Sequence, residues 1–330
     1  MSWLSRVIDA GGEQRYELAE IREGLFVGEG ARSAKLTQFW MLLALSSFIA
    51  AGGVIGDSTP AVIGAMIIAP LATPIYGVAL ATSIGSGKNL RNSLLLLVSG
   101  IGVNILIGVF AAAITVQHMP LDVNPQITGR TAPTALDLAI AIAVGVAGSF
   151  ALTRRDVSNI VAGVAIAISL VPVLAVVGIT LAAGRLDLAS GAFLLFLTNV
   201  AAILVSGVLV FGAAHYFREA DKAAARPGRR ARAFIAVFLV VLLVPLVAAS
   251  TRTYRYERWV SATQAAAERW VEGTDWEVQS VGVVNDVIVI DALGPGTAPP
   301  LAPLTVDVRT HVPEKIEVRL IEHAGAQTDL

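Results

Sequence analysis

The sequence contains no cysteine. Disulfide bonds, thiolate metal sites and cysteine nucleophiles are therefore excluded. Charge is also scarce, because 15% of the 330 residues are charged, whereas soluble domains carry about 25%. The net charge of -1 argues against a nucleic-acid-binding protein, which needs a basic surface.

Sequence motifs of the common enzyme classes are missing as well. There is no Walker-type phosphate loop and no HExxH zinc motif. His118 and His215 lie in or beside expected loops, and the position of Asp57 at the edge of an apolar run disfavours an intramembrane aspartyl protease. We therefore expect no enzyme activity, no catalytic residue, no metal ion and no cofactor.

Apolar residues dominate the sequence. They make up 55% of it, and the mean hydropathy is +0.71. Runs of about 17 to 25 residues are long enough to cross a hydrocarbon core of ~30 Å. They predict an all-α polytopic membrane bundle of about seven transmembrane helices. The runs lie near residues 38–56, 60–84, 92–115, 134–152, 157–182, 188–213 and 232–250.

The ends of the chain suggest separate roles. Residues 1–37 carry charge and amphipathic spacing, which favours a cytosolic helical segment lying on the membrane surface. This stretch has no apolar core or cleavage site of a signal peptide, so we expect the first membrane helix to direct insertion. Residues 38–250 form the expected transmembrane domain, and residues 251–330 form an expected soluble domain.

Basic residues alternate between the linkers. They concentrate after the second, fourth and sixth runs, as Lys88, Arg154 and Arg229 illustrate. The positive-inside rule then predicts a cytoplasmic N-terminus, an extracytoplasmic C-terminal domain and residence in the cytoplasmic (inner) membrane. Arg252, Arg255 and Arg258 oppose this orientation, but the summed bias of the other linkers outweighs them.

The most informative stretch is residues 55–84. It is apolar and rich in small residues, yet it contains Pro60, Pro70 and Pro74 and has Asp57 at its entrance. A proline inside a membrane helix frees a carbonyl, which is tolerated only inside protein or beside a wet cavity. We therefore expect a broken helix that helps to build a site.

The two halves of the apolar region resemble each other. Residues 38–115 align with residues 134–213 at a shift of about 95 to 99 positions, as in a repeat. Three crossings per copy would turn the second copy upside down, which is a recurrent transporter plan with the substrate near the midplane. The pairs with most weight are Asp57 with Asp156, Pro74 with Pro172, and Asn104 with Asn199.

One segment carries a recognisable signature. Gly56, Asp57 and Ser58 are followed by the core Ile63-Gly64-Ala65-Met66-Ile67-Ile68, then Pro70, Leu71, Pro74 and Ile75. This pattern resembles an uncharacterised hydrophobic membrane-protein family, domain of unknown function 389, over about residues 36–250. The position after Leu71 is often methionine in that family and is Ala72 here. The resemblance implies membrane residence and a shared fold, and it brings no substrate.

The C-terminal stretch predicts a small α+β domain. Residues 254–273 have helical spacing, and residues 276–284 and 287–293 read as strands joined by a tight turn. Residues 304–312 fit either a strand or a helix, and Pro299 and Pro300 favour the helix. Residues 315–322 read as a last strand. About 75 residues is near the lower limit for an independent core, so we expect a homo-oligomer.

Candidate site residues come from the expected breaks and from polar groups at depth. Asp57 and Asp156 are either helix N-caps or gate and ion-binding residues. Asn104 and Asn199 either line a site or join helices by hydrogen bonds. The full set is Asp57, Ser58, Pro70, Thr73, Pro74, Asn104, Asp156, Ser169, Pro172 and Asn199.

Three functions fit this pattern. The first is a transporter or permease for a small solute or ion, with the lipid bilayer as its surroundings. The second is an oligomeric ion channel, and the third is a non-transporting sensor or scaffold that holds the C-terminal domain. The substrate, the coupling ion and the direction of transport do not follow from the sequence.

Overall fold

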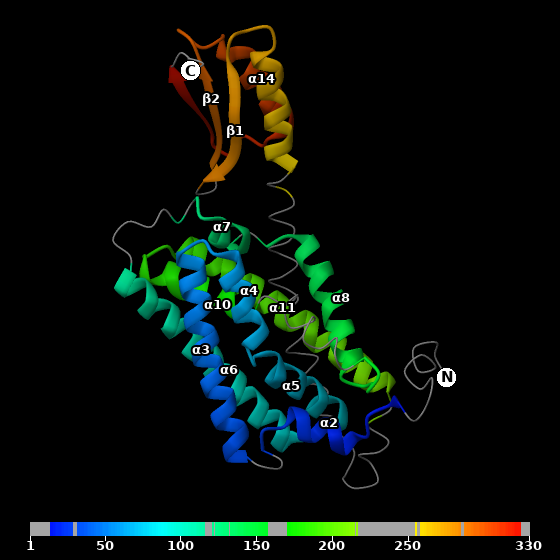
Figure 1. Cartoon of the computed structure of the whole chain (residues 1–330). Helices are drawn as coiled ribbons and strands as arrows, with labels where there is room; N and C mark the ends of the chain where they lie inside the picture. The colour runs from blue at the N-terminus through cyan, green and yellow to red at the C-terminus, as the bar shows by residue number, and fades with distance from the viewer. Residues whose placement is uncertain are drawn as a thin grey trace. The chain divides into compact units, whose positions relative to one another are not determined.

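The computed structural model describes residues 14–28, 32–115, 123–131, 133–157, 170–214, 258–284 and 287–324, and the single residues 121, 216 and 255 (Figure 1). The chain forms two compact units, residues 1–248 and 249–330. The first contains the helices α2 (Leu18–Leu25), α3 (Arg32–Ile55), α4 (Thr59–Ile68), α5 (Ala72–Ile84), α6 (Gly87–Thr115), α7 (Pro125–Thr131), α8 (Ala135–Ala151), α10 (Leu170–Ala182) and α11 (Leu186–Ala213).

Within the described residues, three helices are long and apolar enough to cross a membrane: α3, α6 and α11. Counting the bent pairs α4–α5 and α7–α8 as one span each raises the number to five. These elements correspond to five of the expected runs. The first half of the expected run at 157–182 and all of the run at 232–250 lie outside the described residues, so the expected seven spans are not all observed.

Two parts of the first unit share one local plan. The helices α5 and α10 are each followed by a left-handed glycine, Gly85 or Gly184, with φ of 73°. After Gly85, the N–H of Ser86 donates to the Ala81 carbonyl, and after Gly184 that of Arg185 donates to the Thr180 carbonyl. Glycine accommodates this helix ending without the cost of a Cβ. The long helices α6 and α11 follow, with 29 and 28 residues.

Small residues let two pairs of helices approach closely. A Cβ added to Gly108 of α6 would lie 2.8 Å from the Ala175 carbonyl oxygen and 3.1 Å from Gly178 Cα, both in α10. A Cβ added to Gly207 of α11 would lie 2.7 Å from the Ala79 Cβ of α5. Such close crossings are typical of membrane helices, where small residues at the interface replace the hydrophobic driving force.

The connections gather at two ends of this unit. At one end, the segment 14–28 contacts the start of α6 and the residues that follow α8 and α11. The Tyr16 N–H donates to the Thr153 carbonyl at 3.0 Å, and the Tyr216 hydroxyl donates to the Tyr16 carbonyl at 3.0 Å. Gly28 lies against the side chain of Asn92.

At the other end, the segment 123–131 contacts the turn between α3 and α4. The Asn124 side-chain amide donates to the Val54 carbonyl at 2.9 Å, and the Gln126 side-chain amide donates to the Thr59 hydroxyl at 2.9 Å. The helix α7 in this segment also packs against α11. The described connections therefore lie alternately at one end and the other along the chain, as expected when successive helices run across the unit in opposite directions.

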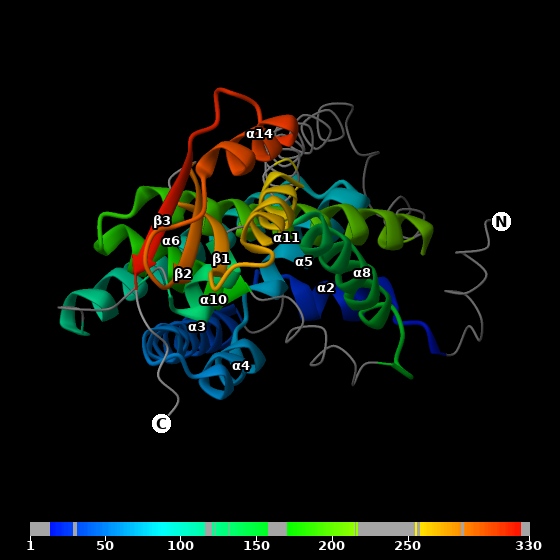
Figure 2. The same ribbon diagram turned by 90° about the horizontal axis from the view of Figure 1, so that it is seen from above.

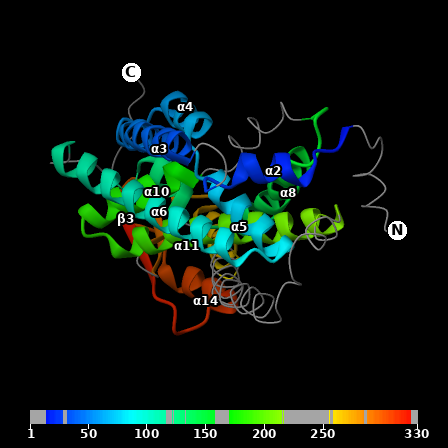
Figure 3. The ribbon, with the colours of Figure 1, turned by 90° about the horizontal axis from the view of Figure 1, so that it is seen from below.

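The N-terminal helix α2 is amphipathic, but its apolar face does not lie open to the membrane surface as expected. Leu18, Ile21 and Leu25 are buried in the core of the first unit, and α2 packs against α5 (Figure 3). A Cβ on Gly77 of α5 would come within 3.3 Å of the Leu25 carbonyl oxygen. The apolar face of α2 can be buried against α5 because the absence of a side chain at Gly77 lets the two helices approach closely.

The second unit is a small α+β domain, as predicted. The strands β1 (Glu277–Val284) and β2 (Val287–Gly294) pair antiparallel, and β3 (Val318–Ala324) pairs parallel with β2, in the order β1-β2-β3. The parallel connection requires a crossover, which contains α14 (Leu301–His311). The ambiguous segment at 304–312 is therefore helical, as the two preceding prolines favoured.

One face of this sheet forms the core of the second unit. Burial alternates along β2, with Ile288, Ile290 and Ala292 inside. The helix at 258–271 and α14 cover that face (Figure 2), and they contribute Trp270 and Leu304 to the same cluster. The Trp270 indole donates to the Pro300 carbonyl at 3.0 Å, so its polar atom is satisfied.

The close crossing of α6 and α10 generates a stability prediction. Gly108→Ala and Gly178→Ala should each lower the unfolding free energy by about 1–3 kcal/mol, the usual cost of overpacking. Gly102→Ala is the matched control, because it lies on α6 with nothing within 4 Å of an added Cβ. It should be neutral or slightly stabilising, since alanine is the better helix former. Thermal unfolding of the full chain in detergent checks this, and equal effects at all three positions would contradict it.

Candidate functional site

The helix break predicted in the second run is present between α4 and α5. The two helix axes meet at 42°, and Ala69, the C-cap residue of α4, adopts an extended conformation. Because Pro70 has no N–H, the Met66 carbonyl four residues earlier loses its helical partner. Pro74 is buried in the first turn of α5, where N–H groups have no helical acceptor, so it costs no hydrogen bond.

Asn104 is the buried polar residue beside this break. It is 0% exposed, and neither its amide nitrogen nor its amide oxygen has a hydrogen-bond partner among the described residues. Gly100 and Gly108 lie one helical turn before and after it, on the same face of α6. Gly100 packs against Leu71, just before α5, and Gly108 packs against Ala175 of α10. Asn104 therefore faces the region between α5 and α10.

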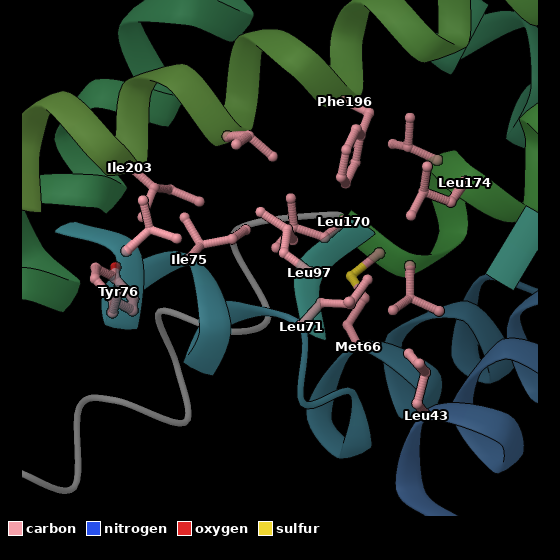
Figure 4. Close-up of a cluster of buried hydrophobic side chains, with 14 of the residues drawn as sticks. Leu43, Met66, Leu71, Ile75, Tyr76, Leu97, Leu170, Leu174, Phe196 and Ile203 are labelled. Atoms are coloured by element: carbon pink, nitrogen blue, oxygen red, sulfur yellow. The ribbon is translucent and has the colours of Figure 1, made fainter. Parts of the chain in front are cut away.

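The surroundings of this region are apolar. Leu71 and Leu170, at the beginnings of α5 and α10, belong to one buried cluster with Met66, Leu97 and Leu174 (Figure 4). An unpaired amide in such surroundings costs about 1–3 kcal/mol. A polar group kept at this cost is a candidate for contact with a polar ligand.

The counterpart break predicted near Ser169 and Pro172 is only partly visible. Pro172 is buried in the first turn of the described part of α10. Ser169 and the residues before it lie outside the described residues, so the geometry of this break is not described. Asn199 is 8% exposed on α11, one turn before the buried Ile203.

Asp57 does not cap α4, which was one of the two alternatives in the sequence analysis. It is exposed and adopts a left-handed conformation with φ of 47°. The next N–H, that of Ser58, donates to the Gly53 carbonyl at 2.7 Å. This is the geometry of a helix C-terminus, so Asp57 ends α3 rather than capping α4. Ser58 is the N-cap residue of α4, and its side chain makes no capping hydrogen bond.

Asp156 is likewise remote from the buried amide. It follows α8, is exposed and forms an ion pair with Arg154 at 2.6 Å. This hydrogen-bonded partner holds the pKa of the Asp156 carboxyl below its ordinary value. Asp57 and Asp156 thus lie beside opposite ends of the helical unit, and the structure brings neither to Asn104. Thr73, in contrast, lies half-buried in the first turn of α5, and its N–H donates to the Pro70 carbonyl.

Two further buried polar residues escaped the sequence analysis. The hydroxyls of Ser47 in α3 and Tyr76 in α5 are buried without a hydrogen bond of normal geometry among the described residues. Tyr76 lies two positions after Pro74, and that proximity to the break was a signal available in the sequence. Ser47 follows another serine in an apolar run and gives no comparable signal.

These observations define the class of protein: a helical chain with apolar helices compatible with membrane integration, joined to a small mixed-sheet domain. Residues 66–205 match the family described as Domain of unknown function (DUF389). Over these residues the chain is similar to this family, and the resemblance seen in the core motif is confirmed.

The chain is also similar to an uncharacterized protein of Methanocaldococcus jannaschii, with 33% identity over 174 residues. The match covers 52% of this chain and 53% of that relative, so it spans about half the length of each. No solved structure matches the chain.

The unpaired amide generates a prediction that separates a ligand-binding role from a structural one. Asn104→Leu keeps the branched shape and the number of side-chain heavy atoms and removes the desolvated amide, so the unfolding free energy should rise by about 1 kcal/mol or more. Thr180→Val is the contrast, because the equally buried Thr180 hydroxyl donates to the Val176 carbonyl at 2.7 Å. That variant should lose about 1 kcal/mol. Thermal unfolding in detergent measures both, and a loss of stability in Asn104→Leu would indicate that Asn104 joins helices.

Proposed function

We propose that this chain is an integral membrane transporter or permease for a small polar solute or ion. The observation that carries the proposal is the broken α4–α5 helix beside the fully buried amide of Asn104, which has no hydrogen-bond partner among the described residues. Discontinuous helices with unsatisfied polar groups in the middle of a helical bundle are how many transporters form a substrate site. The site residues we propose are Pro70, Thr73, Pro74, Asn104, Pro172 and Asn199.

We also propose that the helical unit consists of two inverted repeats. Gly207 lies 99 positions after Gly108, and Gly178 lies 99 positions after Ala79. The contact of α6 with α10 thus has its counterpart in the contact of α11 with α5, with the roles of the two halves exchanged. A two-fold relation between the halves produces this exchange.

This register corrects one pairing that the sequence suggested. A shift of 99 positions places Asn199 opposite Gly100 and places Asn104 opposite Ile203. The two asparagines are therefore one helical turn apart in the aligned repeats. Because one turn preserves the face of a helix, both amides still belong to equivalent faces of α6 and α11.

The transport proposal is tested with the full chain in proteoliposomes. The probes are K⁺, Na⁺ and H⁺ fluxes, followed with ion-sensitive dyes, and glycerol permeation, followed by vesicle swelling. Asn104→Leu should lower any flux of the wild-type protein at least about tenfold, the factor for losing one good hydrogen bond to the solute. Ser190→Ala, which removes an exposed hydroxyl on α11, is the control and should keep the flux.

Each result of this experiment bears on the function. Equal flux in Asn104→Leu and wild type would contradict a site at Asn104. Unitary currents in planar bilayers would indicate a channel instead of a carrier. No flux of any probe would favour the sensor or scaffold.

We further propose that the end formed by residues 14–28 is cytoplasmic. Because the chain has no cysteine, single cysteines report the side directly. Thr59→Cys and Thr128→Cys should react with an impermeant thiol reagent in intact spheroplasts, whereas Glu17→Cys and Lys88→Cys should react only after permeabilisation. All four side chains are exposed. The opposite pattern would invert the orientation, and labelling of all four in intact cells would contradict a membrane-spanning unit.

A further inference from the structure

A cavity opens where the chain enters α3. Its volume is about 210 Å³. The polar side chains of the lining are Arg32, Asn92 and Ser99, and the other lining residues are Val27, Gly28, Leu36, Leu95 and Leu96. The cavity therefore lies between the N-terminal segment, the first two turns of α3 and residues 92–99 of α6, with Arg32 and Asn92 nearest the charged ends of the two helices.

The cavity lies at the level where both helices change from charged to apolar. In α3, Arg32 and Lys35 precede the apolar run, and in α6, Lys88 and Arg91 precede it. In a helix that crosses a bilayer, this change marks the boundary between headgroups and hydrocarbon. A ligand in this cavity would meet headgroup chemistry on one side and acyl-chain chemistry on the other.

The polar side offers donors for an anion. Arg32 is exposed, and within the described part of the chain it makes no ion pair. A guanidinium binds a phosphate with paired hydrogen bonds, and the Asn92 amide supplies a further donor.

The apolar side continues into an exposed stripe along α6. Leu95 is 63% exposed, Val98 65%, Leu106 67% and Phe110 59%. Their spacing of three to eight positions keeps them on one side of the helix. Large exposed apolar residues in such a row are expected to face lipid in a membrane protein, so an acyl chain has a continuous apolar surface that begins at the cavity.

We propose that this cavity binds an anionic phospholipid from the leaflet on the side of residues 14–28. Its phosphate lies against Arg32 and Asn92, and one acyl chain follows Leu36 and Leu95 along α6. Such a site between the segment 14–28 and two spanning helices lets the lipid composition of one leaflet stabilise their contact. The proposal is independent of whether the chain transports a solute.

The test uses the full chain in nanodiscs of phosphatidylcholine with a minor share of phosphatidylglycerol, read out by native mass spectrometry of retained lipid. The wild type should retain phosphatidylglycerol in preference to phosphatidylcholine. Arg32→Gln should weaken this preference about tenfold, because a charge-assisted phosphate contact is lost. Arg91→Gln is the control. It removes an exposed charge near the start of α6, at the same end of the unit as Arg32 but outside the cavity lining, and it should leave the preference unchanged.

A second arm separates a lipid from free phosphate. Leu95→Gln changes an exposed residue, so the fold should persist, and it should weaken retention of phosphatidylglycerol. Inorganic phosphate alone, added to the protein in neutral detergent, should not raise the unfolding temperature as phosphatidylglycerol does. Equal stabilisation by both ligands, with no effect of Leu95→Gln, would assign the cavity to free phosphate. If Arg32→Gln and Arg91→Gln weakened the preference for phosphatidylglycerol equally, the preference would come from general surface charge. If Arg32→Gln left the preference unchanged, the proposed site would be wrong.

Discussion

The close approach of helices at two crossings is the constraint on which the first unit depends. At Gly108–Gly178 and at Gly207–Ala79 there is no room for a larger side chain. Between apolar helices in lipid, association comes from such close packing rather than from the hydrophobic effect. The crossings also fix how the two halves of the unit interlock, because each joins a helix of one half to a helix of the other. The helix breaks and the buried amide are positioned by this arrangement.

The two ends of the unit are fastened by different chemistry. The end that includes residues 14–28 has ion pairs, such as Arg155 with Glu20 at 2.7 Å, and this partner lowers the pKa of the Glu20 carboxyl. The other end is fastened by the uncharged side chains of Asn124 and Gln126, and it also carries the Arg185–Asp187 ion pair at 2.7 Å and Arg130, which donates to Gln126. Ion pairs therefore occur at both ends and do not by themselves distinguish the cytoplasmic one.

Apolar run length predicted α3, α6 and α11 well, and the proline pattern predicted the break between α4 and α5, because both signals are local. The strands and α14 were predicted by alternation and by the preceding prolines. The N-cap prediction for Asp57 was wrong because the three residues between α3 and α4 can end one helix or begin the next, and the backbone conformation decides between these. The proposed repeat register differs from the pairing of Asn104 with Asn199, because apolar helices tolerate a slip of one turn without changing faces. Asn104 itself was identified from the sequence. That its amide has no hydrogen-bond partner among the described residues could be seen only from the three-dimensional packing.

The polar groups at the centre limit what the site can hold. Asn104 offers one donor group and one acceptor without formal charge, and the break at Pro70 adds the freed Met66 carbonyl. A small ion with a tightly held hydration shell loses far more on entering an apolar region than an amide and a carbonyl return. A neutral polar solute, or an ion that keeps part of its water, needs only a few hydrogen bonds, which these groups supply. The proposed site therefore favours solutes with little charge density. The reason is that its polar groups are neutral, and no charged residue is buried beside them among the described residues.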